Sequence, residues 1–126
     1  MTLNIPQIAI LTKGDEARFF ALLDERLELC RKALMCRHEN LKGTLSDISP
    51  IHWQYGAIAR LKKGEKIDRY LMNGYSTISL GYIGLYEASI LITGASHTQP
   101  KGEAFARKVL QRMSDACTRW REESGI

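Results

Sequence analysis

The sequence predicts an α/β fragment that is predominantly helical, with two strands and long amphipathic helices. Residues 2–11 and 75–83 are rich in β-branched, aliphatic and aromatic side chains, which favours strands. Two long stretches between and after them carry apolar residues at helical spacing. Strands separated by long helices usually belong to parallel α/β architecture, but two strands alone do not form a stable sheet. We therefore expect residues 1–126 to be one segment of a larger sheet, with no internal repeat and no second domain.

The N-terminal half begins with a strand over residues 2–11, in which Pro6 marks an edge, a start or an interruption. A turn then leads to Asp15, a residue type that caps helix N-termini. The clearest helix follows over residues 16–41, with charged residues on one face and apolar residues on the other, and Gly43 ends it. The predicted apolar face comprises Phe20, Leu23, Leu27, Cys30, Leu34 and Leu41.

The middle of the chain lacks long regular elements. A loop of Ser, Asp and Pro is expected over residues 44–50, and a short, aromatic, weakly helical stretch over 51–61. A turn follows at Lys63 and Gly64, and one or two helical turns over residues 67–72. The chain then breaks at Asn73-Gly74.

The second strand, over residues 75–83, lacks a wholly polar face, so we expect both of its faces to be covered. A short apolar helix over residues 84–93 ends at Gly94. A polar loop over residues 95–101 precedes the last helix, over 102–123. Its apolar stripe comprises Phe105, Val109, Met113, Ala116, Cys117 and Trp120.

Composition and charge exclude several classes of protein. Apolar residues make up 44% and charged residues 25%, which is ordinary for a globular domain and excludes a disordered chain. Net charge is +4, and the densest basic run, Arg60 to Arg69, is interrupted by Glu65 and Asp68. This run is either a solvated face or a phosphate-binding patch. Residues 78–93 are apolar but shorter than the about 20 residues that span a membrane.

The three cysteines, Cys30, Cys36 and Cys117, form no C-x-x-C pair and no disulfide framework. An odd count without a signal-peptide pattern predicts a cytoplasmic protein. Cys36 and Cys117 lie near apolar helical positions, where a thiol is mostly inert.

Few residues suggest a functional site. Asn4 lies in an apolar strand, where its amide could contact a substrate or form a structural hydrogen bond. Glu87 is the odd charge on the apolar helix, and is either exposed, hydrogen-bonded or functional. Gly81 and Gly84 flank a strand-to-helix junction but lack both the dinucleotide fingerprint and the P-loop lysine, which favours close packing.

The remaining polar and aromatic residues give no catalytic pattern. His38, His52 and His97 have no metal-ligand spacing, so no metal site is expected. No catalytic triad or paired-carboxylate arrangement can be placed either. Aromatic residues could line a pocket, but aromatic residues near apolar strands are usually core. These are Trp53, Tyr55, Tyr75, Tyr82 and Tyr86.

Three motifs nevertheless resemble one family. Residues 3–9, LNIPQIA, resemble the N-[IL]-P-R-I-A run of anaerobic (class III) ribonucleoside-triphosphate reductases. Residues 50–57, PIHWQYGA, are similar to their P-I-L-[WY]-Q-Y-G-A, and residues 73–87, NGYSTISLGYIGLYE, resemble their most recognisable internal segment. The resemblance covers essentially the whole chain.

The resemblance implies a slice of a ten-stranded α/β glycyl-radical barrel. The full-length family reduces ribonucleoside triphosphates to deoxyribonucleotides, with formate as reductant, a glycyl radical, a zinc site, nucleotide effectors and a separate iron–sulfur activase. None of Cys30, Cys36 and Cys117 matches a catalytic cysteine of the family, so the resemblance implies no catalytic residue and no cofactor in this segment. Asn4 and Glu87 are its only weak candidates for substrate binding. The implied partner is the remainder of the barrel, with no membrane or nucleic acid involved.

Two positions depart from the family pattern. Gln7 replaces the usual Arg, which puts in doubt any anion contact that this Arg makes. Met1 stands where the family continues upstream, so we expect either an artificially cut chain or a naturally truncated product. The resemblance implies that the chain alone is inactive, because the residues for radical storage and transfer lie outside it. We expect its uncovered apolar surface to cause self-association or rearrangement into a helical bundle. Two alternatives stay open: a non-catalytic helical interaction module, and a weak nucleic-acid binder that uses residues 60–69.

Overall fold

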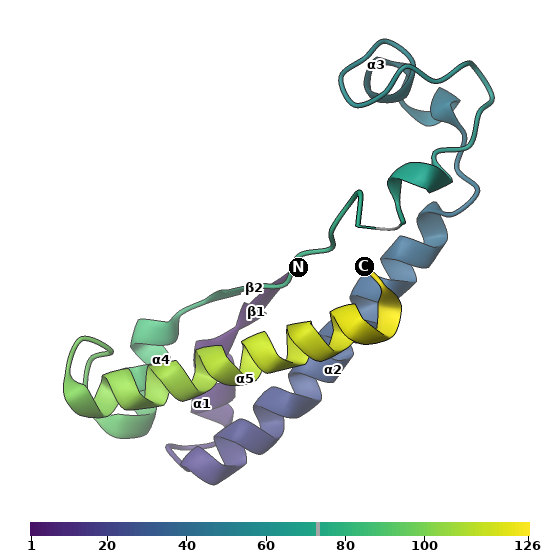
Figure 1. Cartoon of the computed structure of the whole chain (residues 1–126). Helices are drawn as coiled ribbons and strands as arrows, with labels where there is room; N and C mark the ends of the chain where they lie inside the picture. The colour runs from purple at the N-terminus through teal and green to yellow at the C-terminus, as the bar shows by residue number, and fades with distance from the viewer. Residues whose placement is uncertain (73) are drawn as a thin grey trace.

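The computed structural model describes residues 1–72 and 74–126, and it is predominantly helical with one pair of parallel strands. In Figure 1 the strands and two short helices lie at one end of two long helices. The elements are β1 (Thr2–Asn4), α1 (Ile5–Leu11), α2 (Glu16–Leu41), η1 (Ser46–Ile48), α3 (Pro50–Trp53), η2 (Asp68–Tyr70), β2 (Gly81–Ile83), α4 (Leu85–Thr93) and α5 (Pro100–Ser124).

The first predicted strand is wrong beyond Asn4, because residues 5–11 form helix α1 instead. The Asn4 side chain accepts a hydrogen bond from the backbone N–H of Gln7 at 3.1 Å and so caps the helix. Pro6 lies in the first helical turn, where its fixed φ suits a helix and its missing N–H costs nothing. A local capping signal therefore outweighs the β-branched composition.

The second strand is shorter than predicted, since only Gly81–Ile83 pair with β1. The register joins Thr2 to Gly81 and Asn4 to Ile83, and β1 offers no further residue as partner. The prediction that both faces of this strand are covered is wrong for this chain, because Tyr82 and Ile83 are 42% and 55% exposed.

Helix α2 has the predicted bounds, and Asp15 caps it by accepting from the N–H of Arg18 at 3.0 Å. Its buried face is rotated slightly from the predicted one. Phe19 is fully buried, whereas Phe20 is only partly buried and Leu41 is exposed. Phe19 meets the rings of Phe20 and Phe105 edge-on, with centroids 5.4 and 5.1 Å apart, and this aromatic cluster sets which side of α2 faces the core.

Helices α2 and α5 run in the same direction and pack across each other (Figure 1). Their ion pairs follow the same order along both helices, from Glu16–Lys108 through Asp24–Arg112 to Arg31–Glu123. The α5 stripe is buried from Phe105 to Ala116, but Cys117 is exposed and Trp120 is half-buried. The main core joins α1, α2, α4 and α5, with Leu3, Ile5, Ile8, Phe19, Leu23, Leu27, Ala88, Phe105, Val109 and Met113 among its residues.

Residues 43–72, here called the hook, extend beyond the C-terminal end of α2 (Figure 1). The predicted turn at Lys63 and Gly64 is confirmed, but the weakly helical stretch has helical structure only over Pro50–Trp53. The hook has its own small core of Ala59, Leu61, Ile67 and Leu71. The break predicted at Asn73-Gly74 falls partly outside the described residues.

The other C-terminal predictions are confirmed with small shifts. Helix α4 ends at Gly94 as predicted, and α5 begins at Pro100, within the stretch predicted as a loop. Nowhere in the part of the chain that the structure describes is a helix both long and apolar enough to cross a bilayer.

Candidate functional site

The carboxyl end of the parallel strand pair is the best candidate for a site. Asn4 and Ile83 are partners in the register, and each strand runs directly into a helix, α1 or α4. In open α/β sheets ligands bind outside the carboxyl ends of strands. The fold therefore brings the two sequence-predicted residues, Asn4 and Glu87, to the same edge of the sheet.

Asn4 is exposed, and its Oδ1 accepts the N–H of Gln7. This is the structural hydrogen bond that the sequence left open as one of two roles. Among the described residues its Nδ2 has no hydrogen-bond partner, so the amide can still donate to another group.

Glu87 is exposed in the first turn of α4, not buried within the apolar helix. A carboxylate is favourable there because the helix N-terminus carries partial positive charge. No ion pair joins Glu87 to a described residue, and its Oε2 lies beside Gly84, at the junction between β2 and α4.

The Gly81–Gly84 junction is closely packed. Gly84 has a φ of +77°, and a Cβ placed on it would lie 2.1 Å from Cγ and 2.4 Å from Cδ of Pro6. The ring of Pro6 thus occupies the space that any side chain at residue 84 would need. This agrees with the packing role expected from the sequence and leaves no cradle for a phosphate at this glycine.

The three histidines lie apart on different elements. His38 is buried near the end of α2 with no hydrogen-bond partner for Nε2, His52 Nδ1 lies 2.6 Å from the Ser49 hydroxyl, and His97 packs edge-on against Tyr86. Within the described ranges, 1–72 and 74–126, no group of three or more potential metal ligands comes together.

The cysteines are poorly placed for nucleophilic chemistry. Burial raises the pKa of the Cys30 thiol, and partial desolvation by neighbouring atoms raises the pKa of Cys117 although that residue is exposed at the surface. Both therefore stay protonated at neutral pH, and the thiolate is the reactive form. Cys36 is exposed, and its sulfur lies 3.7 Å from the Asn40 amide nitrogen.

The aromatic residues do not line one pocket. Trp53 packs against Tyr70 in the hook, with ring centroids 5.7 Å apart, and Tyr75 packs against Tyr70 at 4.8 Å. Tyr82 and Tyr86 are exposed near the candidate edge instead. The aromatic side chains therefore divide between the hook and the sheet.

A small cleft between the C-terminal halves of α2 and α5 was not predicted from the sequence. It holds about 90 Å³ and is lined by Leu34, Met35, Ile78, Leu80 and Trp120, among others. The Trp120 Nε1 is buried, and no described residue accepts a hydrogen bond from it. The cleft has room for only a few waters, which is too little for a nucleotide.

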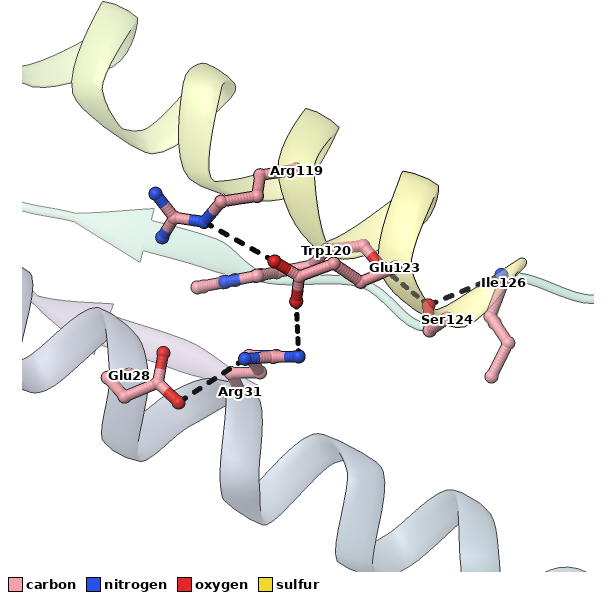
Figure 2. A network of polar contacts seen from close by, with 7 residues as sticks. All are labelled: Glu28, Arg31, Arg119, Trp120, Glu123, Ser124 and Ile126. Atoms are coloured by element: carbon pink, nitrogen blue, oxygen red, sulfur yellow. Dashed lines mark hydrogen bonds and ion pairs between the residues drawn. The ribbon is translucent and has the colours of Figure 1, made fainter.

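Ion pairs close the helix crossing beside this cleft (Figure 2). Arg31 reaches Glu28 on its own helix and Glu123 on α5, at 3.5 and 2.5 Å. Glu123 also meets Arg119, and the Ser124 hydroxyl donates to the Trp120 carbonyl at 2.6 Å. The ion pairs form a chain from Glu28 through Arg31 and Glu123 to Arg119, and the Arg31–Glu123 pair joins α2 to α5.

Comparison with known proteins gives one consistent result. A family model described as anaerobic ribonucleoside-triphosphate reductase matches residues 1–126. The chain is 40% identical over 128 residues to the anaerobic ribonucleoside-triphosphate reductase of Escherichia coli (strain K12), covering 99% of this chain and 18% of that protein. It is 39% identical over 131 residues to the enzyme of the same name from Enterobacteria phage T4, covering 100% of this chain and 20% of that protein.

A third relative, from Haemophilus influenzae, is 37% identical over 132 residues, with 99% of this chain and 18% of the relative covered. The chain thus spans about a fifth of the length of the curated relatives that it matches. Because the family model covers every residue, the three motifs, over residues 3–9, 50–57 and 73–87, fall within one match. The chain therefore belongs to the anaerobic ribonucleoside-triphosphate reductase family.

Proposed function

We propose that this chain works as a segment of the catalytic polypeptide of an anaerobic ribonucleoside-triphosphate reductase, in the cytoplasm. The observation that carries the proposal is the match of all 126 residues to a family whose curated relatives, compared above, are about five times as long. In the whole enzyme the segment would contribute to the reduction of ribonucleoside triphosphates to deoxyribonucleotides.

Within that enzyme the segment would form part of the wall of a ten-stranded barrel, as one stretch of a single catalytic domain. Parallel sheets are normally covered on both faces and paired at both edges. Here β1 and β2 pair only with each other in the described residues, and Tyr82 and Ile83 are exposed. This uncovered surface supports a larger sheet that continues into the rest of the reductase.

The carboxyl edge with Asn4 and Glu87 is the part of the segment that would face substrate. Asn4 would use its free amide donor, and Glu87 its uncommitted carboxylate. The glycyl radical, zinc, effector sites and iron–sulfur activase implied by the resemblance would lie outside this segment.

A chimera tests the proposal. The matching stretch of the Escherichia coli relative is replaced by residues 1–126, and deoxyribonucleotide formation is measured with activase and formate. We expect turnover from the chimera and none from the isolated chain. An inactive chimera that folds and assembles like the parent would refute the role as a reductase segment, and turnover by the isolated chain would refute the need for the remainder.

Two variants at Asn4 separate capping from substrate contact in that chimera. Asn4→Asp keeps a side-chain oxygen that caps a helix N-terminus about as well as that of Asn, but it removes the amide donor. Asn4→Ala removes both the capping oxygen and the amide donor. If the amide contacts substrate, Asn4→Asp lowers kcat/KM while the melting temperature stays unchanged. Full activity in Asn4→Asp would assign Asn4 to capping alone. Glu87→Gln is the corresponding change for the carboxylate.

Self-association of the isolated chain follows from the same uncovered surface. Large apolar side chains such as Ile10, Ile83 and Leu91 are 63%, 55% and 47% exposed. Large apolar side chains that remain exposed promote association in water where they gather into patches. Light scattering should therefore give a mass above that of one 14.3 kDa chain, and a clean monomer would contradict the expectation.

A further inference from the structure

The small cleft between the C-terminal halves of α2 and α5 has apolar walls. Leu34 and Met35 line it from α2, and Ile78 and Leu80 line it from the segment that leads into β2. Leu34 is buried, and the other three side chains are partly buried. Concave apolar sites with a few fixed polar groups are the usual form of a small-molecule binding site.

The polar side chains that reach into this lining are hydrogen-bond donors. Trp120 contributes an indole N–H whose nitrogen is buried, and no described residue accepts a hydrogen bond from it. Arg31 and Arg121 bring guanidinium groups to the same cleft, and a guanidinium can only donate. A buried donor without an acceptor is unfavourable, so the cleft favours an occupant that accepts hydrogen bonds.

The charge beside the cleft is positive. Figure 2 shows Arg31 held between Glu28 and Glu123, at 3.5 and 2.5 Å, so its charge is compensated within the chain. Arg121, by contrast, is exposed and forms no ion pair with a described residue. Desolvation raises the pKa of Cys117, which also lines the cleft, so its thiol stays protonated and adds no negative charge.

From these donors set on apolar walls, we propose that the cleft binds the carboxylate of a short aliphatic acid with three or four carbon atoms. The carboxylate would accept from the Trp120 N–H and face Arg121, while the alkyl chain would cover Leu34 and Leu80. The volume of about 90 Å³ sets the length of the acid, since it equals about three water molecules. An inorganic phosphate would leave the apolar walls without a partner.

Water alone suits the cleft less well than a carboxylate. A water molecule has to donate its own two protons as well as accept, and a buried water typically makes about three hydrogen bonds. Among the described side chains of the lining, the Ser124 hydroxyl is already engaged. It donates to the Trp120 carbonyl at 2.6 Å and accepts the Ile126 N–H at 3.4 Å. A carboxylate only accepts, which matches a lining that mainly donates.

Nuclear magnetic resonance of the indole N–H groups tests the site in the chain itself. The chain has two tryptophans, Trp53 in the hook and Trp120 in the cleft, and Trp53→Phe assigns the two signals. Butyrate should move the Trp120 proton downfield along a saturating curve, with a dissociation constant of about 1–10 mM for so few atoms. The Trp53 signal should stay in place. A Trp120 shift that never saturates, or equal shifts of both signals, would overturn the proposal.

The ligand series separates the apolar walls from the charge. Affinity should rise about fourfold for each carbon added from acetate to butyrate, because each methylene gains apolar contact. It should stop rising at hexanoate, which exceeds the cleft. Butyramide has the shape of butyrate without its charge and should bind more weakly. Equal affinity for acetate and butyrate would overturn the assignment of the walls, and equal affinity for butyramide would overturn the assignment of the charge.

Three variants test the named donors. Arg121→Gln should weaken butyrate binding about three- to fivefold, as expected for an exposed ion pair, whereas Arg119→Gln, on the same helix but outside this lining, should leave it unchanged. Trp120→Phe keeps an aromatic ring without the N–H and should weaken binding about tenfold, read from saturation transfer to the butyrate methyl group. Equal binding by the two arginine variants, or full binding by Trp120→Phe, would overturn the proposal. These readouts do not depend on reductase activity in the chimera.

Discussion

Replacing Gly84 with alanine should destabilise the fold far more than the same change at Gly94. The two glycines flank α4 and have nearly equal φ values, +77° and +74°. Both positions therefore carry the cost of a left-handed backbone for a residue with a Cβ, about 1–2 kcal/mol. Only Gly84 also faces a neighbour, because its added Cβ would lie 2.1 Å from Cγ of Pro6, whereas no atom lies within 4 Å at Gly94.

The contact adds a steric cost at Gly84 alone. Forcing an extra carbon into a packed contact typically costs about 1–3 kcal/mol. Because Pro6 belongs to a helix that packs on α4, the contact can relax only by moving α1 against α4. We expect Gly84→Ala to lower the free energy of unfolding by about 2–5 kcal/mol, as the sum of the two effects, and Gly94→Ala to lower it by the backbone cost alone.

Urea unfolding followed by circular dichroism measures both losses. The double variant Pro6→Ala/Gly84→Ala removes the Cγ and Cδ atoms that the new Cβ would meet. It should recover the steric part, about 1–3 kcal/mol, as a favourable coupling energy in the double-mutant cycle. Equal losses for the two glycine variants, or no coupling with Pro6→Ala, would refute the argument from the Pro6 contact.

Three further predictions concern other parts of the molecule. The side-chain hydrogen bond from Arg112 holds the pKa of Asp24 below its ordinary value, so the pair should stabilise the fold above about pH 4 and lose this effect as the pH falls through the lowered pKa. Both side chains are about half exposed, so Asp24→Asn should lower the free energy of unfolding by at most about 1 kcal/mol at pH 7. The same substitution should cost nothing at pH 2, and unfolding measured over a range of pH checks both values. With a thiol reagent, Cys36 should react first and Cys30 slowest, because Cys36 is exposed and Cys30 is buried with a raised pKa; a fast phase that persists in Cys36→Ser would contradict this order. Phe19→Ala should cost about 3–5 kcal/mol of unfolding free energy, because the ring is fully buried between two other aromatic rings; a loss below 1 kcal/mol would place Phe19 outside the core.

Local signals in the sequence were sufficient to predict where several helices begin or end. The bounds of α2 follow from Asp15 as N-cap and from the apolar spacing, and the end of α4 follows from Gly94. The family likewise follows from short motifs in the sequence, and the whole-chain match agrees with it. Such features depend on interactions within a few residues, which a sequence displays directly.

Other features depended on contacts between distant residues. The β-branched run after Asn4 reads as a strand, yet a cap and a proline in the first turn make it a helix. The limit of β2 depends on the length of β1, and the full burial of Phe19 involves packing against Phe105 on α5. The partners of β2 and of Phe19 lie too far away in sequence to be identified from local pattern, whereas the cap and the proline of α1 are local signals that compete with the β-branched composition.

The candidate site shows the same division. The sequence by itself selected Asn4 and Glu87 by residue type, and it determined the helical character and the family of the chain. Only the tertiary structure placed the two residues at one edge, by pairing β1 with β2 in parallel across most of the chain. It also decided that the hook carboxylates Asp47, Glu65 and Asp68 bind backbone amides. The physical reason is that helix caps and periodicity act over a few residues, whereas strand pairing, burial and charge compensation depend on which distant groups the folded chain brings together.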